Sequence, residues 1–317
     1  MRRVAAIDCG TNTIKLLVAD LDPSTGTAHE YLREMRMVRL GQDVDRTGRL
    51  AVAALERVFG AIDDYARLIG SHDVDALRFC ATSAARDASN ADVFAAGVRD
   101  RLGVLPEVVS GDEEAQLSYD GATRALLGGD TPEPVLVVDI GGGSTELILG
   151  DLSSAPGHPG RGSVRASQSL DIGSVRMTER HLHSDPPEDA EVTAAAEDVA
   201  QKIEHTVVPL GDARTVVGVA GTITTVAAGV LRLASYDREA IDASVLSYAD
   251  VHAMTKSLLA MTKAERTALP YMHPGRADVI GAGALILDLV LRRTSAGSLR
   301  VSEADILDGI AWSLAGA

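Results

Sequence analysis

Aromatic residues and positive charge are both scarce in this chain of 317 residues. Phe, Trp and Tyr make up 3% of it, which predicts an aliphatic core and leaves few rings on which nucleic-acid bases could stack. Thirty Lys and Arg stand against 45 Asp and Glu, so the formal net charge is -15. This charge opposes general binding to nucleic acid or anionic lipid. We expect neither partner, and a polyanionic ligand would need a local basic patch or a metal ion.

Cysteines and long hydrophobic runs are also few. Cys9 and Cys80 are too few for a disulfide framework, which indicates a reducing, cytoplasmic location. The basic start of the chain is interrupted at Asp8 after four apolar residues, so no secretory signal is expected. The longest uncharged stretch, residues 215–231, contains four threonines and three glycines and is shorter than a membrane-spanning helix.

Three common motifs of nucleotide and ester chemistry are missing. No G-x-x-x-x-G-K-[ST] sequence occurs, which argues against a P-loop nucleotidase. The segment 281–286 lacks the third glycine of the dinucleotide-binding pattern, and 142–146 lacks the closing glycine of a hydrolase nucleophile elbow. These classes of enzyme are therefore disfavoured.

What the chain does contain is an internal duplication. The apolar run 4–7 is followed by Asp8 and a polar glycine turn, and the run 135–138 is followed by Asp139 and a second glycine turn. A single copy could be an ordinary hairpin. Two copies favour phosphate-binding loops, because glycines let backbone N–H groups approach an anion and an Asp can hold Mg²⁺.

Alternating strand and helix patterns predict an α/β fold. We expect helices over 51–69, 91–102, 110–127, 188–207 and 277–291, and strands over 76–81, 106–109 and 216–219. The segment 128–134 holds two glycines and two prolines and predicts a domain boundary. The expected domains are 1–127 and 128–317, with a last helix at about 303–316 that packs back on the first domain.

Some polar residues have both a structural and a functional interpretation. Ser110 and Glu113 have the spacing of a capping box, whereas Glu114 is one position beyond it. Arg86 follows the strand 76–81 and could bind a phosphate or simply lie near a helix cap. His181 and His183 are the closest pair of histidines, but a metal site is disfavoured because no further ligand accompanies them.

Several segments in order resemble the exopolyphosphatase and guanosine pentaphosphate phosphohydrolase (Ppx/GppA) family. They are residues 6–13, 81–90, 110–115 and 138–146, with weaker agreement at 219–222 and 276–280. The resemblance implies two duplicated actin-like domains of the sugar kinase, Hsp70 and actin superfold, with a cleft between them. It also implies a short two-domain form of the family. Cys9 and Thr13 depart mildly from the family pattern.

The resemblance also implies roles for individual residues. Glu114 corresponds to the catalytic glutamate that prepares a water molecule, and Arg86 to an arginine that faces the phosphates. Asp139 and Glu146 correspond to acidic residues that bind Mg²⁺, with Mn²⁺ as the alternative metal. The phosphate-binding residues implied are Asp8, Gly10, Thr11, Asn12 and Thr13 in one loop and Gly141, Gly142, Gly143 and Ser144 in the other.

The activity implied is that of an exopolyphosphatase, which releases terminal orthophosphate from inorganic polyphosphate. The alternatives are a pppGpp 5'-phosphohydrolase of the stringent response, a paralogue that binds polyphosphate or an alarmone without hydrolysing it, and a kinase of the same superfold. A homodimer is expected from the resemblance alone.

Overall fold

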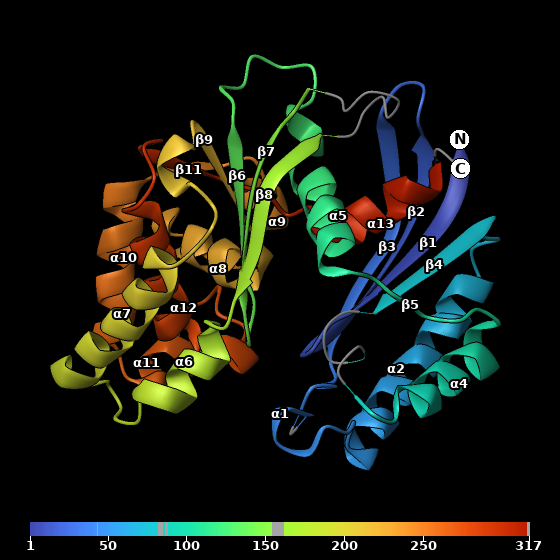
Figure 1. The fold of residues 1–317 in the computed structure, drawn as a ribbon, viewed down its shortest axis with the longest axis horizontal. Coiled ribbons are helices and arrows are strands. Elements are labelled where there is room, and N and C mark those ends of the chain that lie inside the picture. The colour runs from blue at the N-terminus through green and yellow to red at the C-terminus, as the bar shows by residue number, and fades with distance from the viewer. Residues whose placement is uncertain (43, 82–84, 86–87, 154–161, 316–317) are drawn as a thin grey trace. The chain divides into compact units, whose positions relative to one another are not determined.

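The computed structural model describes residues 1–42, 44–81, 85, 88–153 and 162–315 (Figure 1). The chain forms two compact units, Met1–Gly121 with Ile306–Ala317 and Ala122–Asp305. This division falls before the predicted boundary between residues 127 and 128, since the turn Arg124–Leu126 already belongs to the second unit. Across the described residues, no helix is long and apolar enough to cross a membrane.

The first unit contains a sheet of five strands in the order β3-β2-β1-β4-β5. Its strands are β1 Arg2–Cys9, β2 Thr13–Asp22, β3 Thr27–Met37, β4 Ala76–Ala81 and β5 Glu107–Val108. β1 pairs antiparallel with β2 and parallel with β4. Its helices are α1 Val44–Thr47, α2 Val52–Gly70, α4 Ala91–Leu102, α5 Gly111–Thr123 and α13 Ile306–Ala315.

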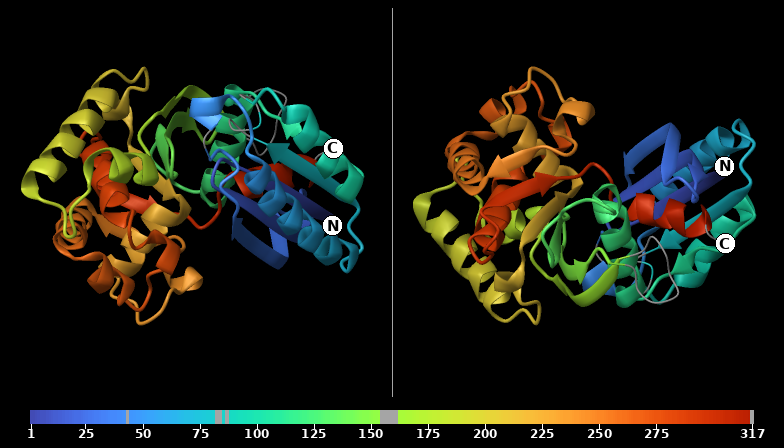
Figure 2. Two further views of the ribbon diagram at one scale, coloured as in Figure 1. Left: turned by 90° about the horizontal axis from the view of Figure 1, so that it is seen from below. Right: turned by 90° about the horizontal axis from the view of Figure 1, so that it is seen from above.

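Both faces of this sheet are buried, which explains why β1 has a continuous apolar run rather than an alternating one. Ala5 and Ile7 face the core shared with α2 and α4. Val4 and Ala6 face a second core, which contains Leu307 and further residues of α13. The last helix of the chain is therefore part of the unit that the first strand begins (Figures 1 and 2).

The second unit contains a sheet of six strands in the order β10-β11-β9-β6-β7-β8. Its strands are β6 Val135–Ile140, β7 Thr145–Asp151, β8 Ser163–Leu170, β9 Thr215–Val219, β10 Val245–Ser247 and β11 Ser298–Val301. Its helices are α6 Ser174–His181, α7 Asp189–Glu204, α8 Ala220–Val230, α9 Arg238–Ile241, α10 Tyr248–Ala260, α11 Lys263–Thr267 and α12 Ile280–Leu291, with 3-10 turns at Arg124–Leu126, Leu210–Asp212 and Pro274–Arg276.

The two sheets repeat one topology, which confirms the duplication. β6 pairs antiparallel with β7 and parallel with β9, as β1 does with β2 and β4. Even the register shifts correspond: one lies between Val18 and Ala19 of β2, and the other between Leu149 and Gly150 of β7. The two copies of the sequence motif therefore begin equivalent hairpins in equivalent sheets.

Most of the predicted elements are present, with shorter ends. The helices expected over 51–69 and 91–102 are α2 and α4, and the strand expected over 76–81 is β4. The strand expected over 106–109 is only two residues long, and α5 ends at Thr123 rather than 127. α7 ends at Glu204, ahead of Pro209, and α12 begins at Ile280, after a 3-10 turn. The last helix begins at Ile306 rather than 303.

Candidate phosphate loops and acidic residues

The first candidate phosphate loop is the turn between β1 and β2. Gly10 donates its backbone N–H to the carbonyl oxygen of Thr13 at 2.9 Å, which closes the turn. The carbonyl oxygen of Asn12 accepts from the N–H groups of Val38 and Arg39, each at 2.9 Å. The structure thus brings Asp8, Gly10, Thr11, Asn12 and Thr13 together at one end of β1.

The second candidate loop, between β6 and β7, has the same closure. Gly141 donates its N–H to the carbonyl oxygen of Ser144 at 3.0 Å. In the described part of the chain, the N–H groups of Gly142, Gly143 and Ser144 donate no hydrogen bond. Successive N–H groups of this kind can bind a phosphate without any positive side chain.

The first turn of α6 lies against this loop. Ser174 donates its backbone N–H to the carbonyl oxygen of Gly141 at 2.9 Å, and Val175 donates to that of Gly142 at 2.9 Å. The Arg176 guanidinium donates from Nε to the carbonyl oxygen of Gly143 at 2.7 Å. The loop is therefore held from one side by a helix that sequence analysis did not identify.

The two repeats differ in the charge opposite the aspartate that both contain. In the first unit Asp8 lies opposite Lys15 in the register of β1 and β2, and their charged atoms are 3.8 Å apart. At the equivalent register position of the second unit, Asp139 lies opposite Glu146. Directly opposed side chains on antiparallel strands have Cβ atoms about 4.5–5.5 Å apart, and like charges there repel each other. A bound cation would relieve that repulsion.

Glu146 is also the acceptor of two hydroxyl groups. Ser144 donates to its Oε1 atom at 2.6 Å and Ser169 at 2.8 Å. The hydroxyl of Ser144, which the family resemblance assigns to phosphate binding, is directed to Glu146 in this structure.

Glu114 lies in the first turn of α5, half-buried. The Oγ atom of Ser110 accepts from the N–H of Glu113 at 3.2 Å, which is the serine half of the predicted capping box. The carboxylate of Glu113 is bound by Arg78 of β4 at 2.6 Å. Glu113 thus has a structural partner, which fixes the turn that also carries Glu114.

Three further sets of residues were singled out in the sequence, namely Arg86, the histidine pair and the two cysteines. Arg86 lies outside the described residues. His181 binds Asp198 through Nε2 at 2.9 Å, and no group of three or more His, Cys, Asp and Glu side chains in the described ranges could hold a metal ion. Cys9 and Cys80 are both buried free thiols.

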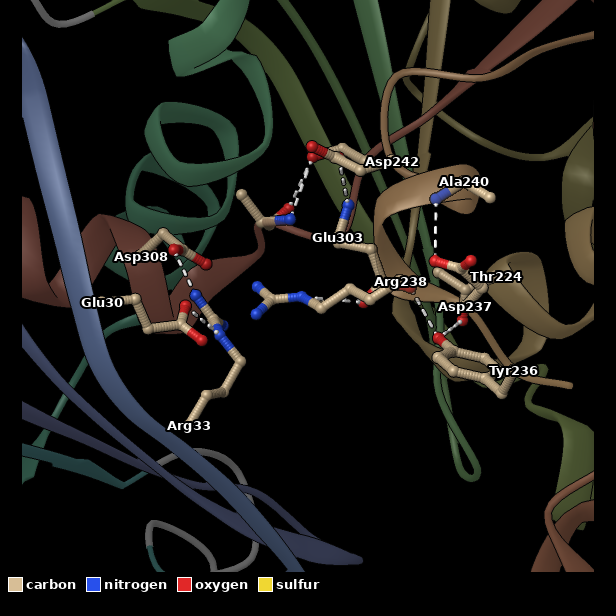
Figure 3. Close-up of polar contacts among 12 residues, drawn as sticks. Glu30, Arg33, Thr224, Tyr236, Asp237, Arg238, Ala240, Asp242, Glu303 and Asp308 are labelled. Carbon is tan, nitrogen blue, oxygen red and sulfur yellow. Dashed lines mark hydrogen bonds and ion pairs between the residues drawn. The ribbon is translucent and has the colours of Figure 1, made fainter.

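A polar cluster at the ends of β9 and β11 was not recognised in the sequence (Figure 3). Tyr236 donates its hydroxyl to Oε1 of Glu303 at 2.6 Å and lies 2.8 Å from Oγ1 of Thr224 in α8. Partial burial, together with the bond to Glu303, raises the pKa of Tyr236 to about 12. The backbone N–H of Glu303 in turn binds Asp242 at 2.9 Å. These bonds fix the segment after β11 to the start of α8.

Comparisons with known proteins agree with these features. Residues 18–316 match the Ppx/GppA phosphatase family. The chain is 49% identical to Exopolyphosphatase 2 of Mycobacterium tuberculosis, over 100% of this chain and 99% of that protein. It is 27% identical to the guanosine-5'-triphosphate,3'-diphosphate pyrophosphatase of Aeromonas salmonicida, over 98% of this chain and 59% of that protein.

Solved structures are similar over the whole chain. The crystal structure of the Aquifex aeolicus member of the same family superimposes with a TM-score of 0.84 at 31% identity, covering 99% of this chain and 97% of that one. The fold is thus the expected pair of duplicated actin-like α/β domains.

Proposed function

The chain belongs to the Ppx/GppA phosphatase family, and from this premise we propose that it is an exopolyphosphatase that releases terminal orthophosphate from inorganic polyphosphate. The observation that carries the proposal is 49% identity, over the full length of both chains, to a protein named Exopolyphosphatase 2. The two equivalent glycine turns support it, because each presents backbone suited to an anion at the end of a strand.

The reaction is phosphoryl transfer to water. The oxygen of a water molecule attacks the terminal phosphorus, the bridging P–O bond breaks, and the shortened polyphosphate leaves with the bridging oxygen. We assign Glu114 as the group that orients this water and accepts its proton. The turn of α5 that carries Glu114 is fixed through Glu113 and Arg78, which suits a residue that must hold a water in line.

The N–H groups of the second loop suit the negative phosphate oxygens. Gly142, Gly143 and Ser144 have no acceptor among the described residues, so their dipoles can stabilise charge that grows in the transition state. The first loop, from Asp8 to Thr13, is assigned the same role in the first unit. Arg86 as a further phosphate contact and the homodimer stay predictions.

Asp139 and Glu146 fit a magnesium ion. They supply hard oxygen ligands, and the opposed carboxylates of the second unit lack the lysine that faces Asp8 in the first. Mg²⁺ commonly takes one or two carboxylates and completes its shell with water and phosphate, so two residues suffice. Bound there, the ion would neutralise phosphate charge, which a chain of net charge -15 needs locally.

Hydrolysis of pppGpp to ppGpp is the second candidate. The 27% identity to an enzyme named for that nucleotide supports it, at lower identity and over 59% of the length of that enzyme. The chemistry at phosphorus is the same, so the two candidates differ only in the substrate.

The proposal is tested by measuring orthophosphate release from short-chain polyphosphate, long-chain polyphosphate and pppGpp, with Mg²⁺ or with EDTA. We expect metal-dependent release that is fastest with a polyphosphate. Glu114→Gln should fold normally and lose at least about 90% of the rate, because it cannot accept a proton. Glu146→Gln should raise the Mg²⁺ concentration needed for half-maximal rate.

Asp112→Asn is the matched control, since Asp112 is exposed in the same turn of α5. Its rate should stay within about twofold of the unchanged protein. Fastest release from pppGpp would favour the second candidate. No release from any substrate by folded protein would reject hydrolysis and favour a binding role, and more than a tenth of the rate in Glu114→Gln would show that the base is another residue.

A further inference from the structure

We propose that Arg176 is a positioning residue that holds the glycine loop 141–143 in its anion-binding conformation, together with the backbone of the first turn of α6. This inference rests on the proposed function, because it assigns a role within the same phosphate-binding loop. Arg176 acts through the protein backbone, and no contact between its side chain and the substrate is assumed.

Three successive carbonyl groups of the loop are held from the side of α6. The carbonyl oxygen of Gly141 accepts from the N–H of Ser174 at 2.9 Å and from its hydroxyl at 3.2 Å. That of Gly142 accepts from the N–H groups of Val175 at 2.9 Å and Arg176 at 3.1 Å. The carbonyl oxygen of Gly143 accepts from Nε of Arg176 at 2.7 Å.

Fixing these carbonyls also fixes the N–H groups that follow them. A trans peptide unit is planar, and its C=O and the next N–H point in opposite directions. Carbonyls directed towards α6 therefore turn the N–H groups of Gly142, Gly143 and Ser144 away from it. These are the three donors for which the described residues offer no acceptor. The hydrogen bonds from α6 to the loop carbonyls thus orient all three N–H groups towards a ligand.

Among the described residues, the carbonyl of Gly143 is the one loop carbonyl whose donor from α6 is a side chain alone, that of Arg176. The first two carbonyls also have backbone donors in α6, whereas Gly143 is bound by the guanidinium within the described chain. A loop of three glycines loses more conformational freedom on ordering than any other sequence. The first loop has Thr11 and Asn12 in the corresponding positions, and backbone N–H groups hold both of their carbonyls. The second loop therefore depends on a side chain where the first does not.

Gly173 shows how closely the loop and the helix approach. Its φ of -136° is open to any residue, so no conformational reason requires glycine there. A Cβ atom at this position would lie 2.4 Å from the carbonyl oxygen of Gly142 and 2.5 Å from the carbonyl carbon of Gly143. Glycine is needed because the loop rests directly on the backbone that begins α6.

The test compares Arg176→Met, whose side chain cannot donate a hydrogen bond, with Arg176→Lys, whose charged side chain can. Arg180→Met is the matched control, because Arg180 lies one turn further along α6 and binds Asp198 instead of the loop. We would measure kcat and KM for polyphosphate hydrolysis, the thermal midpoint, and the Kd for tripolyphosphate by calorimetry in a Glu114→Gln background. Arg176→Met should lower kcat/KM by about 10- to 100-fold and weaken tripolyphosphate binding, with a thermal midpoint close to that of the control.

Arg176→Lys should recover part of both losses, which a purely structural role would not predict. If Arg176→Met fails to fold, Gly173→Ala decides, since its Cβ would displace the same loop from the side of α6. A kcat/KM and Kd within twofold of the control in both folded variants would overturn the inference and leave the proposed function standing. Absence of hydrolysis would reject the proposed function, but the Kd for tripolyphosphate would still test the role of Arg176. Absence of any tripolyphosphate binding would overturn both.

Discussion

Arg78 connects three segments of the first unit through one guanidinium. It binds Glu107 of β5 at 2.8 Å, Glu113 of α5 at 2.6 Å and the hydroxyl of Ser313 in α13 at 2.8 Å. Its own side chain is 14% exposed, whereas both glutamates are about half exposed. Solvent screens such pairs, so their value lies more in fixing the first turn of α5 than in stability.

Arg78→Met should therefore lower kcat more than it lowers stability. We expect kcat to fall about 3- to 10-fold, because the adjacent Glu114 is held less firmly, and the free energy of unfolding to fall by about 1 kcal/mol. Steady-state kinetics and urea unfolding would measure the two effects. Arg99→Met is the control, since Arg99 is exposed and its nearest acid, Asp100, is 3.9 Å away. An unchanged kcat would contradict the prediction.

The raised pKa of Tyr236 predicts that the free energy of unfolding decreases at alkaline pH. Its pKa is raised by burial and by the bond to Glu303, so the folded protein keeps the phenol proton up to about pH 12, while an unfolded chain releases it near pH 10. The contribution to stability is complete below pH 10 and declines between pH 10 and about 12, because the folded state binds more protons there.

Tyr236→Phe should accordingly lose less stability than the unchanged protein between pH 9 and pH 11. Urea unfolding followed by circular dichroism at the two pH values measures the difference. Parallel losses in both proteins would show that the proton on Tyr236 does not contribute.

Among residues, the turn motifs could be predicted from the sequence because the chain contains them twice. The contrast between Lys15 and Glu146 was visible only once the strand register placed each opposite an aspartate. Arg176 gave no signal, since its partner is a backbone carbonyl 33 positions earlier, and a carbonyl leaves no trace in the sequence. Contacts of this kind follow from the fold and not from local pattern.

Among elements, β3 and α8 were not predicted because their residue patterns are not typical of a strand or a helix. β3 is an edge strand whose side chains are largely exposed and include four charged ones, so it lacks the apolar alternation of a half-buried strand. α8 is buried on almost every side and contains Thr222, Thr224 and Thr225, so neither helical periodicity nor propensity marks it. α2, with one buried face, was predicted to within a residue or so at each end.

The close packing of α13 against α5 depends on Gly309. A Cβ atom there would lie 1.9 Å from the carbonyl oxygen of Leu117. Gly309→Ala should therefore force the helices apart and reduce the free energy of unfolding of the first unit by about 1–3 kcal/mol. Gly60→Ala in α2 is the matched control, because nothing lies within 4 Å of its added Cβ, and it should stabilise by about 0.5–1 kcal/mol. Equal thermal midpoints for the two variants would contradict this account.

At the scale of the whole molecule, both cysteines and the single tryptophan belong to the first unit. Cys9, Cys80 and Trp312 lie within Met1–Gly121 and Ile306–Ala317, and the chain has no other cysteine or tryptophan. Burial raises the pKa of the Cys80 thiol to about 12 and that of Cys9 further. Neither thiol should then react with an aromatic disulfide at pH 8 until the first unit unfolds.

Thiol labelling and tryptophan fluorescence should therefore follow the same transition in urea, and Gly309→Ala should shift both to lower urea. Circular dichroism would also follow the unfolding of the second unit, because its helices contribute to the signal. Rapid labelling of the native protein would show that the buried thiols are reached by local opening.

The return of α13 to the first sheet has a consequence for synthesis on the ribosome. The strands β1 and β2 emerge first, but the helix that covers Val4 and Ala6 emerges only after residues 122–305. At about 5–20 residues per second, that interval is roughly 10–40 s. The second unit can complete its core during this time, while the first waits with one apolar face uncovered. We therefore expect the second unit to complete its folding before the first, although the first begins to emerge earlier.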